Sequence, residues 1–177
     1  MIPTLETGRL VLRAMKAEDF EPFAAFYATE AARFVGGPED RVAAWRRMAA
    51  YAGSWTLRGY GKFVVEEKQT GRPVGMAGPW FPEDWPEPEL SWTFLPEFQG
   101  RGYATEAAAR SLAFAYDELG WTTAISAIAP GNHRSVRLAE RLGAHREGST
   151  EVDSVGALDI YRHLPPSDFR AHLARLQ

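Results

Sequence analysis

Residues 92–106 constrain the fold of this chain more than any other segment. The segment starts as an alternating apolar strand, stops at Pro96, and passes through a short glycine-rich loop into an alanine-rich helix predicted to end near Leu119. Glycines let a backbone approach a bound anion closely, and the first turn of a helix offers free N–H groups and a partial positive charge. The pattern predicts a strand–loop–helix unit that can hold a phosphate, although a ligand-free turn explains one Gly-x-Gly equally well.

This loop lacks the residues that the commoner nucleotide-binding motifs need. A P-loop ends in Gly-Lys-Ser/Thr, whereas here Gly102 is followed by Tyr103 and Ala104. A dinucleotide-binding loop needs glycine or alanine where Thr105 stands, and a downstream acid that closes a βαβ unit. What remains is the spacing Gln99-x-x-Gly102-x-Ala104, which indicates a phosphate loop of a different class.

The run from Gly100 to Ala107, Gly-Arg-Gly-Tyr-Ala-Thr-Glu-Ala, resembles the pyrophosphate-binding loop of the GNAT acetyltransferase superfamily. It is especially similar to the branch that includes the ribosomal-protein-alanine N-acetyltransferases, and residues 5–19 resemble the start of that branch. The resemblance implies a single GNAT domain over residues 1–177 with the acyl-CoA N-acyltransferase fold. We therefore expect a mixed α/β (α+β) architecture, with a central, mostly antiparallel sheet and helices on both faces.

A second segment, residues 131–143, reads as a short helix that follows a strand. Asn132 stands where an asparagine commonly caps a helix, and that role alone would explain it. The spacing Asn132-x-x-Ser135 also resembles the family segment that lines the pantetheine arm and thiol of the cofactor. Many members of the family carry a tyrosine that acts as general acid where Ala139 stands. In lacking this tyrosine the chain resembles the serine-type branch. That resemblance implies that Ser135 is the general acid or contacts the thiol. Ala144 departs from the aromatic residue usual there.

The resemblance implies acetyl-CoA as co-substrate. The positions that match cofactor-binding residues of the family are Trp92, Phe94, Gln99, Gly100, Arg101, Gly102, Tyr103, Ala104, Thr105, Asn132, Ser135 and Arg137.

Direct transfer to an amine requires a base that takes its proton and a fixed donor for the oxyanion, such as a strand N–H. Strand alternation places Glu89 on one face of residues 89–94, together with two hydroxyl side chains. Glu89 matches the glutamate of the family's Glu-Ile-Gly-Tyr strand, which implies a catalytic base. A solvated charge at a strand edge is an equal alternative, and Glu151 and Asp153 are weaker rivals for the base.

Hydrophobic periodicity predicts further elements. A helix is expected from Pro38 to about Leu57, with one apolar face formed by Val42, Trp45, Met48, Ala49 and Ala52. Strands are expected over residues 74–77, 122–128 and 158–163.

The proline-rich segment 78–88 reads as a loop that could bind the acceptor. Trp80 and Trp85, with Glu89, are the candidate acceptor-binding residues, although a plain packed loop would look the same. We expect acids beside these aromatics to attract a cationic amine: Glu83, Asp84, Glu87 and Glu89.

Composition excludes several classes of protein. The net charge of −3 argues against nucleic acid as the main partner, and no apolar run is long enough to span a membrane. The chain has no cysteine, which removes disulfides and thiol nucleophiles, and its start shows no signal peptide, so we expect a cytoplasmic protein. A homodimer is left open. No metal site is expected, because these histidines lack ligand spacing: His133, His145, His163 and His172.

The function expected from the sequence is transfer of an acetyl group from acetyl-CoA directly to a primary amine. The acceptor is not readable, since a protein N-terminus, a polyamine, an amino-acid derivative and an antibiotic all fit. One alternative is an enzyme that uses another acyl-CoA. The other is a non-catalytic acyl-CoA-binding or sensing protein of the same fold, which a solvated Glu89 and a closed thiol end would favour.

Overall fold

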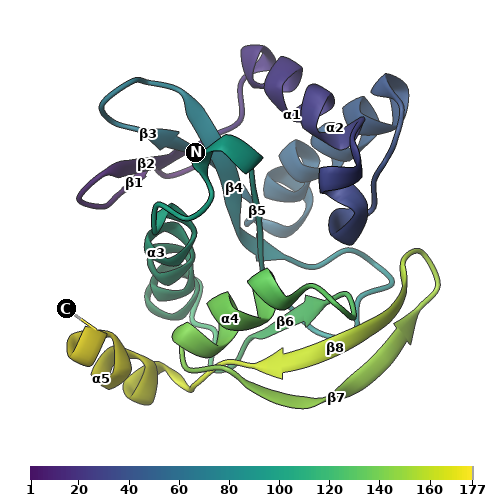
Figure 1. Cartoon of the computed structure of the whole chain (residues 1–177). Helices are drawn as coiled ribbons and strands as arrows, with labels where there is room; N and C mark the ends of the chain where they lie inside the picture. Colours follow the sequence, from purple (N-terminus) through teal and green to yellow (C-terminus); the bar gives the residue numbers. More distant parts are fainter. Residues whose placement is uncertain (177) are drawn as a thin grey trace.

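The computed structural model describes residues 1–176, and the side chains of residues 1–175 (Figure 1). The strands are β1 (Leu5–Glu6), β2 (Leu10–Arg13), β3 (Phe63–Glu67), β4 (Pro73–Trp80), β5 (Glu89–Phe94), β6 (Ile125–Ile128), β7 (His145–Val152) and β8 (Gly156–Arg162). The helices are α1 (Phe20–Tyr27), α2 (Arg41–Arg58), α3 (Tyr103–Asp117), α4 (His133–Arg141) and α5 (Pro166–Leu176). Short 3₁₀ turns cover Ala17–Asp19, Glu30–Val35 and Pro96–Phe98.

The strands form one sheet in the order β1-β2-β3-β4-β5-β6-β8-β7. Every neighbouring pair in it is antiparallel except β5 and β6, which run parallel. Helices α1 and α2 cover one face of the β2–β5 region, and α3 lies on the other (Figure 1). The predicted mixed, mostly antiparallel sheet with helices on both faces is confirmed.

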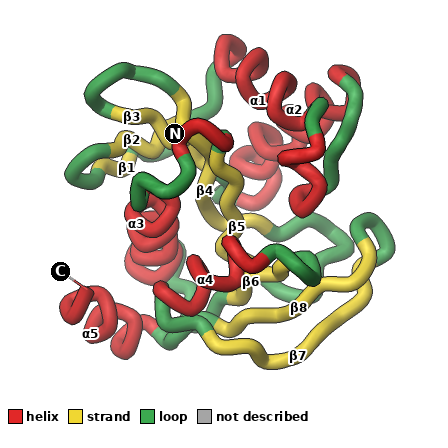
Figure 2. The backbone as a smooth tube through the Cα atoms, viewed as in Figure 1, coloured by secondary structure: helices red, strands yellow, loops and turns green. Residues whose placement is uncertain are grey.

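Strands β5 and β6 separate almost as soon as they meet (Figure 2). Their ladder contains only one pair in the described chain, Glu89 with Ile125. Beyond this pair, side chains replace the backbone hydrogen bonds between the two strands. Ser126 Oγ donates to the Leu90 carbonyl at 2.7 Å, and the Glu89 carboxylate accepts the Ala127 N–H at 3.0 Å. A parallel ladder would otherwise satisfy these backbone groups, so the two side chains fix the point at which the sheet opens.

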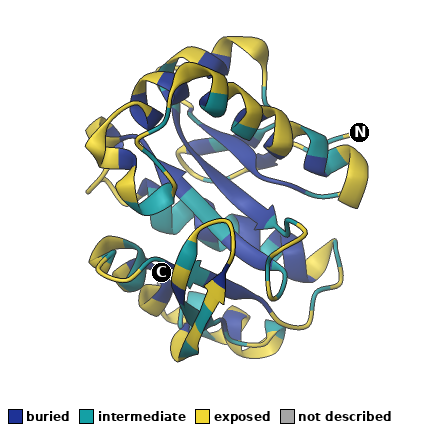
Figure 3. Cartoon of the chain, turned by 90° about the vertical axis from the view of Figure 1, so that its right-hand side faces the viewer, coloured by how far each residue is buried: buried dark blue, intermediate teal, exposed yellow. Residues whose placement is uncertain are grey.

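The core lies where α1, α2 and α3 press on the central strands, which are the most buried part of the chain (Figure 3). Ala107, Ala108 and Ala115 are fully buried on one face of α3. Small side chains let a helix axis approach the sheet closely, which explains the alanine-rich sequence. A second cluster, around Leu112, Leu142 and other residues of α3, α4 and α5, extends the core beneath β6.

Helix α2 begins later than predicted and buries a different face. Asp40 caps it by accepting the Ala43 N–H at 2.8 Å, so the helix starts at Arg41 instead of Pro38. The predicted apolar face through Val42, Trp45, Met48, Ala49 and Ala52 is wrong: Val42 is 58% and Trp45 55% exposed. The buried residues are Ala44, Met48, Tyr51 and Ser54, which share one helical stripe.

Several predicted strand ends also need correction. The strand expected to end at Ala77 continues to Trp80, so this tryptophan lies in β4 and not in a loop. The strand expected from Thr122 begins at Ile125, and β8 begins at Gly156, earlier than the predicted Leu158.

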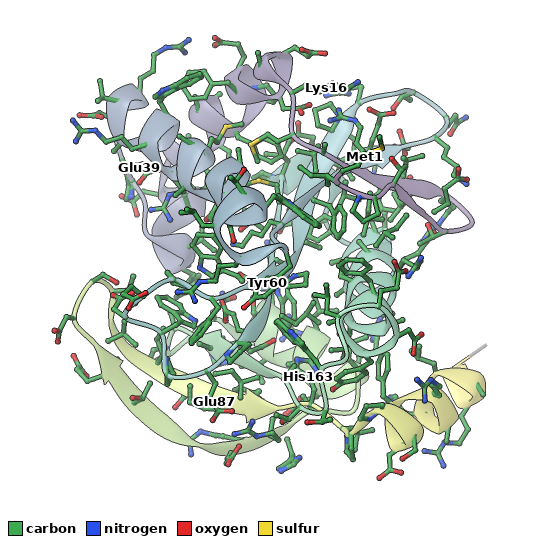
Figure 4. All side chains as sticks on the ribbon, turned by 180° about the vertical axis from the view of Figure 1, so that it is seen from behind. Met1, Lys16, Glu39, Tyr60, Glu87 and His163 are labelled. Atoms are coloured by element: carbon green, nitrogen blue, oxygen red, sulfur yellow. The ribbon has the colours of Figure 1, made fainter. Side chains whose placement is uncertain are left out.

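His163, just after β8, lies in the interior beneath the opened sheet (Figure 4). Its Nε2 is 2.9 Å from Ser126 Oγ, whose proton goes to the Leu90 carbonyl, so Nε2 carries the imidazole proton. Within the described residues, Nδ1 is buried without a partner. Burial, together with the charge of Arg162, lowers the pKa of His163 from 6.5 to about 3.

We expect this histidine to make stability depend on pH. The unfolded chain takes up a proton below pH 6.5 that the native imidazole refuses until about 3, so stability falls as pH decreases. The loss from this group approaches roughly 1.4 kcal/mol per pH unit in that window. His163→Gln keeps a donor toward Ser126 but cannot titrate. Its free energy of unfolding, measured with urea between about pH 7.5 and about 5.5, should therefore fall less with decreasing pH than that of the wild type. The same dependence of the unfolding free energy on pH in both proteins would contradict a buried, neutral His163.

Candidate active site

A cavity of about 350 Å³ opens where β5 and β6 separate. Its walls come from the Glu30–Val35 segment and the glycines after it, α2, β4, β5, β6, the start of α4 and residues 154–158 of the β7–β8 hairpin. Six of the side chains singled out from the sequence meet there: Trp80, Trp85, Glu89, Trp92, Asn132 and Ser135. Residues far apart in the chain are thus brought into one enclosed space.

Glu89 is buried in this cavity wall and only 3% exposed. The interpretation of Glu89 as a solvated edge charge is therefore wrong. Burial raises the pKa of its carboxyl above 4.5, opposed by the charge of Lys62 and by the Ala127 N–H. The indole N–H of Trp85 also lowers this pKa, although within the described residues it has no hydrogen bond of normal geometry. A carboxyl with a raised pKa can accept a proton nearer neutral pH than a free one.

Trp92, Asn132 and Ser135 form another part of the cavity lining. The Trp92 indole donates to Ser135 Oγ at 3.2 Å, and Asn132 Oδ1 accepts the Ser135 N–H at 3.3 Å. Asn132 is therefore the N-cap of α4 and also lines the cavity, so its two suggested roles coincide. Ala139, where many members of the family have a tyrosine, is fully buried. It packs in a small apolar cluster with Ala144 and Tyr161 of β8, so an aromatic ring is present in this cluster although position 144 has none.

The loop before α3 has the backbone geometry of an anion site. Gly100 and Gly102 have φ angles of 78° and 81°, which glycine adopts readily. Across the described chain, no acceptor is found for the backbone N–H groups of residues 100–105. A Cβ at Gly100 would meet no atom within 4 Å, so the space above it is open. The loop can therefore receive an anion on several N–H donors at the positive end of α3.

Side chains of this loop hold its shape. Gln99 donates to the Phe94 carbonyl at 2.9 Å, and its amide oxygen accepts from Arg134. The Tyr103 hydroxyl bonds to Glu67 on the far side of the loop. Arg9 donates to the Arg101 carbonyl at 2.9 Å and also pairs with Glu106. These contacts leave the backbone as the part of the loop that faces open space.

The remaining candidates lie outside the cavity. Phe94 is buried in the main core, whereas Arg101 and Arg137 are exposed at the surface. Arg101 stacks on Phe98, with 5.3 Å between the guanidinium carbon and the ring centroid. Ala104 and Thr105 are half-buried in the first turn of α3.

Three of the four acids expected to attract a cationic amine, Glu83, Asp84 and Glu87, lie outside the cavity. Glu83 pairs with Arg58, and Glu87 makes two hydrogen bonds with Arg162 that hold its pKa below 4.5. Neither glutamate lines the cavity, whose only acidic lining residue in the described chain is Glu89. The cavity also has three basic lining residues, which no local sequence pattern brings together: Arg33, Arg47 and Lys62.

Within residues 1–176, no cluster of three or more His, Asp or Glu side chains could hold a metal ion. In the same part of the chain, none of the helices has both the length and the apolar character needed to cross a bilayer.

The fold is that of an acetyltransferase. The chain belongs to the GNAT acetyltransferase family: the family described as "Acetyltransferase (GNAT) domain" matches residues 9–145. The uncharacterized protein YkkB of Bacillus subtilis (strain 168) is 30% identical over 150 residues, which cover 80% of this chain and 84% of YkkB.

Solved structures agree with this assignment. An acetyltransferase from Agrobacterium tumefaciens superposes with a TM-score of 0.86 at 32% identity, covering 93% of this chain and 95% of that one. An aminoglycoside acetyltransferase solved in complex with coenzyme A shares the fold, with a TM-score of 0.74 at 14% identity over 92% and 98% of the chains. A structure described as a "putative ribosomal-protein-serine acetyltransferase from Vibrio cholerae" shares the fold at 24% identity, with a TM-score of 0.76 over 92% of this chain and 98% of that one. The resemblance to the family is confirmed, whereas this likeness shows the fold and does not fix the branch.

Proposed function

We propose that this protein is an N-acetyltransferase that moves an acetyl group from acetyl-CoA to a primary amine. One observation carries the proposal: the buried Glu89 carboxyl, with its raised pKa, and the Asn132–Ser135 helix start line one cavity, at the point where the sheet opens. The reaction is placed in the cytoplasm, without nucleic acid or membrane as partner, and is compatible with a monomer or a homodimer.

The cofactor would lie along the opening between β5 and β6. The free N–H groups of residues 100–105 suit its pyrophosphate, and the open space above Gly100 gives that group room. Asn132, Ser135 and Trp92 suit the pantetheine arm and the thioester end, because they line the cavity beyond the loop. The fold relative solved with coenzyme A supports this type of ligand.

The proposed chemistry gives a role to three groups in the cavity wall. Glu89, directly or through a water molecule, accepts the proton that the attacking amine must lose. A free N–H of the opened β5 strand can stabilise the oxyanion of the tetrahedral intermediate. The Ser135 hydroxyl, held by Trp92, can donate to the departing thiolate. Because the chain has no cysteine, no acetyl-thiol enzyme can form, and we propose direct transfer in preference to transfer through another side chain.

Two findings favour catalysis over a non-catalytic binding or sensing role. Glu89 is buried in the cavity, whereas a bystander charge would be solvated. The cavity is open at Ser135, whereas a sensor needs no space there for a second substrate.

The test is an amine-panel acetylation assay scored by release of free thiol, repeated with longer acyl-CoA donors. We expect acetyl-CoA-dependent thiol release with at least one class of primary amine, and initial-rate plots that intersect, as a ternary complex requires. Parallel lines would contradict direct transfer. Tight acetyl-CoA binding without thiol release from any amine would favour the sensing role.

A further inference from the structure

Lys62 is a buried lysine whose charge lowers the pKa of Glu89, although the two side chains form no ion pair in the described structure. It precedes β3, is 4% exposed, and lines the cavity that contains Glu89. Its Nζ lies 4.3 Å from the centroid of the Tyr51 ring and 5.5 Å from that of Trp80. No residue whose side chain the structure describes forms a hydrogen bond or an ion pair with this ammonium.

The placement of Lys62 is costly unless a ligand compensates it. Removing a charge from water is unfavourable, and the two aromatic rings, together with the unpaired Glu89 carboxyl in the same cavity, offset only part of that cost. The backbone around Lys62 is nevertheless tightly fixed. A Cβ at Gly78 would come within 2.9 Å of its Cα, and the Trp55 indole donates to its carbonyl at 3.1 Å.

Positive charge predominates in this cavity. Arg33 lines it without an ion pair among the described side chains, and Arg47 lines it while paired with Glu39. Glu89 is the only acid in the described lining, so even when it is ionised as the base, a single carboxylate faces the charges of both Arg33 and Lys62. Burial acts to raise the pKa of Tyr51, but the charges of Lys62 and Arg47 outweigh it, so the pKa of this phenol is lowered. The same excess of positive charge would attract an anion.

We infer that the amine acceptor carries an anionic group, a carboxylate or a phosphate, which binds Lys62 while its amine reaches Glu89. This inference rests on the proposed transferase function and narrows its acceptor class. It replaces the cationic acceptor expected from the sequence, because Glu83 and Glu87 are paired with arginines away from the cavity. Lys62 is a specificity residue in this scheme, and Glu89 remains the base.

The test compares acceptors that differ by one charge. The purified protein is assayed with acetyl-CoA and two pairs of acceptors, each with an anionic and a neutral member. The first pair is γ-aminobutyrate and γ-aminobutyramide, and the second is Ala-Asp-amide and Ala-Asn-amide. Comparing the pairs separates small-molecule from peptide acceptors. We expect kcat/KM to favour the anionic member of at least one pair by about 30-fold or more. Lys62→Met, of similar shape but without charge, should abolish this ratio mainly through KM, whereas Lys62→Arg should keep most of it.

Lys16→Met is the matched control, since it removes an exposed lysine that does not line the cavity (Figure 4). It should keep the wild-type ratio, and thermal unfolding of every variant checks folding. An unchanged ratio in Lys62→Met, or a wild-type preference for the neutral members or for Ala-Lys-amide, would overturn the inference.

Failure of the transferase proposal has a separate signature. If no amine releases thiol, binding alone decides the role of Lys62. γ-Aminobutyrate should then raise the unfolding temperature of the wild type more than γ-aminobutyramide does. In Lys62→Met the two compounds should raise the unfolding temperature equally. Equal shifts in the two proteins would exclude an anion site at Lys62.

Discussion

Glu89→Gln is expected to lower turnover by about 100-fold or more while leaving acetyl-CoA affinity nearly unchanged, because a positioned base contributes roughly 10²–10⁴ to the rate. The glutamine oxygen can still accept the Ala127 N–H, so the opening of the sheet is preserved. Steady-state kinetics and calorimetric titration of acetyl-CoA measure the two effects separately.

The pH profile gives an independent measurement of the same carboxyl. Burial raises its pKa, so activity should rise with pH along an acid limb whose midpoint lies above 4.5, and this limb should disappear in Glu89→Gln. A carboxyl with a raised native pKa also loses stabilising free energy as pH rises through that value. Glu89→Gln should therefore be at least as stable as the wild type at neutral pH, which separates lost chemistry from lost folding.

Glu87→Gln is the matched control for this experiment. It makes the same change two residues earlier, at a half-exposed glutamate that pairs with Arg162 outside the cavity. Its turnover should stay close to that of the wild type. If Glu89→Gln retained full turnover and an unchanged acid limb, Glu89 would be only a structural acceptor for the β6 backbone.

The parts of the site that the sequence predicts are those with local signals. A strand, a proline, two glycines and an alanine run follow one another in residues 92–106, and each dictates backbone conformation within a few residues. The loop before α3 therefore lies where predicted. Asn132 is likewise recognisable as a helix cap because capping depends only on the next three residues.

The acceptor side was not predictable, because it depends on contacts between distant segments. Arg47 and Tyr51 come from α2, Lys62 from the residue before β3, and Glu89 from β5. The error in the buried face of α2 has the same origin. Trp45 is apolar yet exposed, stacking at its edge on Phe20 with ring centroids 5.1 Å apart, while Tyr51 faces the interior. Only the packing of α2 against the sheet decides which stripe is buried.

Gly100→Val is expected to weaken acetyl-CoA binding by about 100-fold or more, which corresponds to losing about two hydrogen bonds to a charged group. The side chain would enter the open space above the free N–H groups of residues 100–105, where the pyrophosphate is proposed to lie. Gly102 gives a less clean test, because a Cβ there would meet the Arg9 guanidinium at 3.2 Å and disturb the loop directly.

Backbone strain alone must be separated from the loss of the anion site. Gly59 at the end of α2 has a φ of 77°, close to the 78° of Gly100, and a Cβ at either position would meet no atom within 4 Å. Gly59→Val therefore introduces similar strain far from the loop before α3. Calorimetric titration should show normal acetyl-CoA affinity in Gly59→Val and weakened affinity in Gly100→Val, at comparable losses of thermal stability. Equal affinities in the two variants would mean that the cofactor phosphates bind elsewhere.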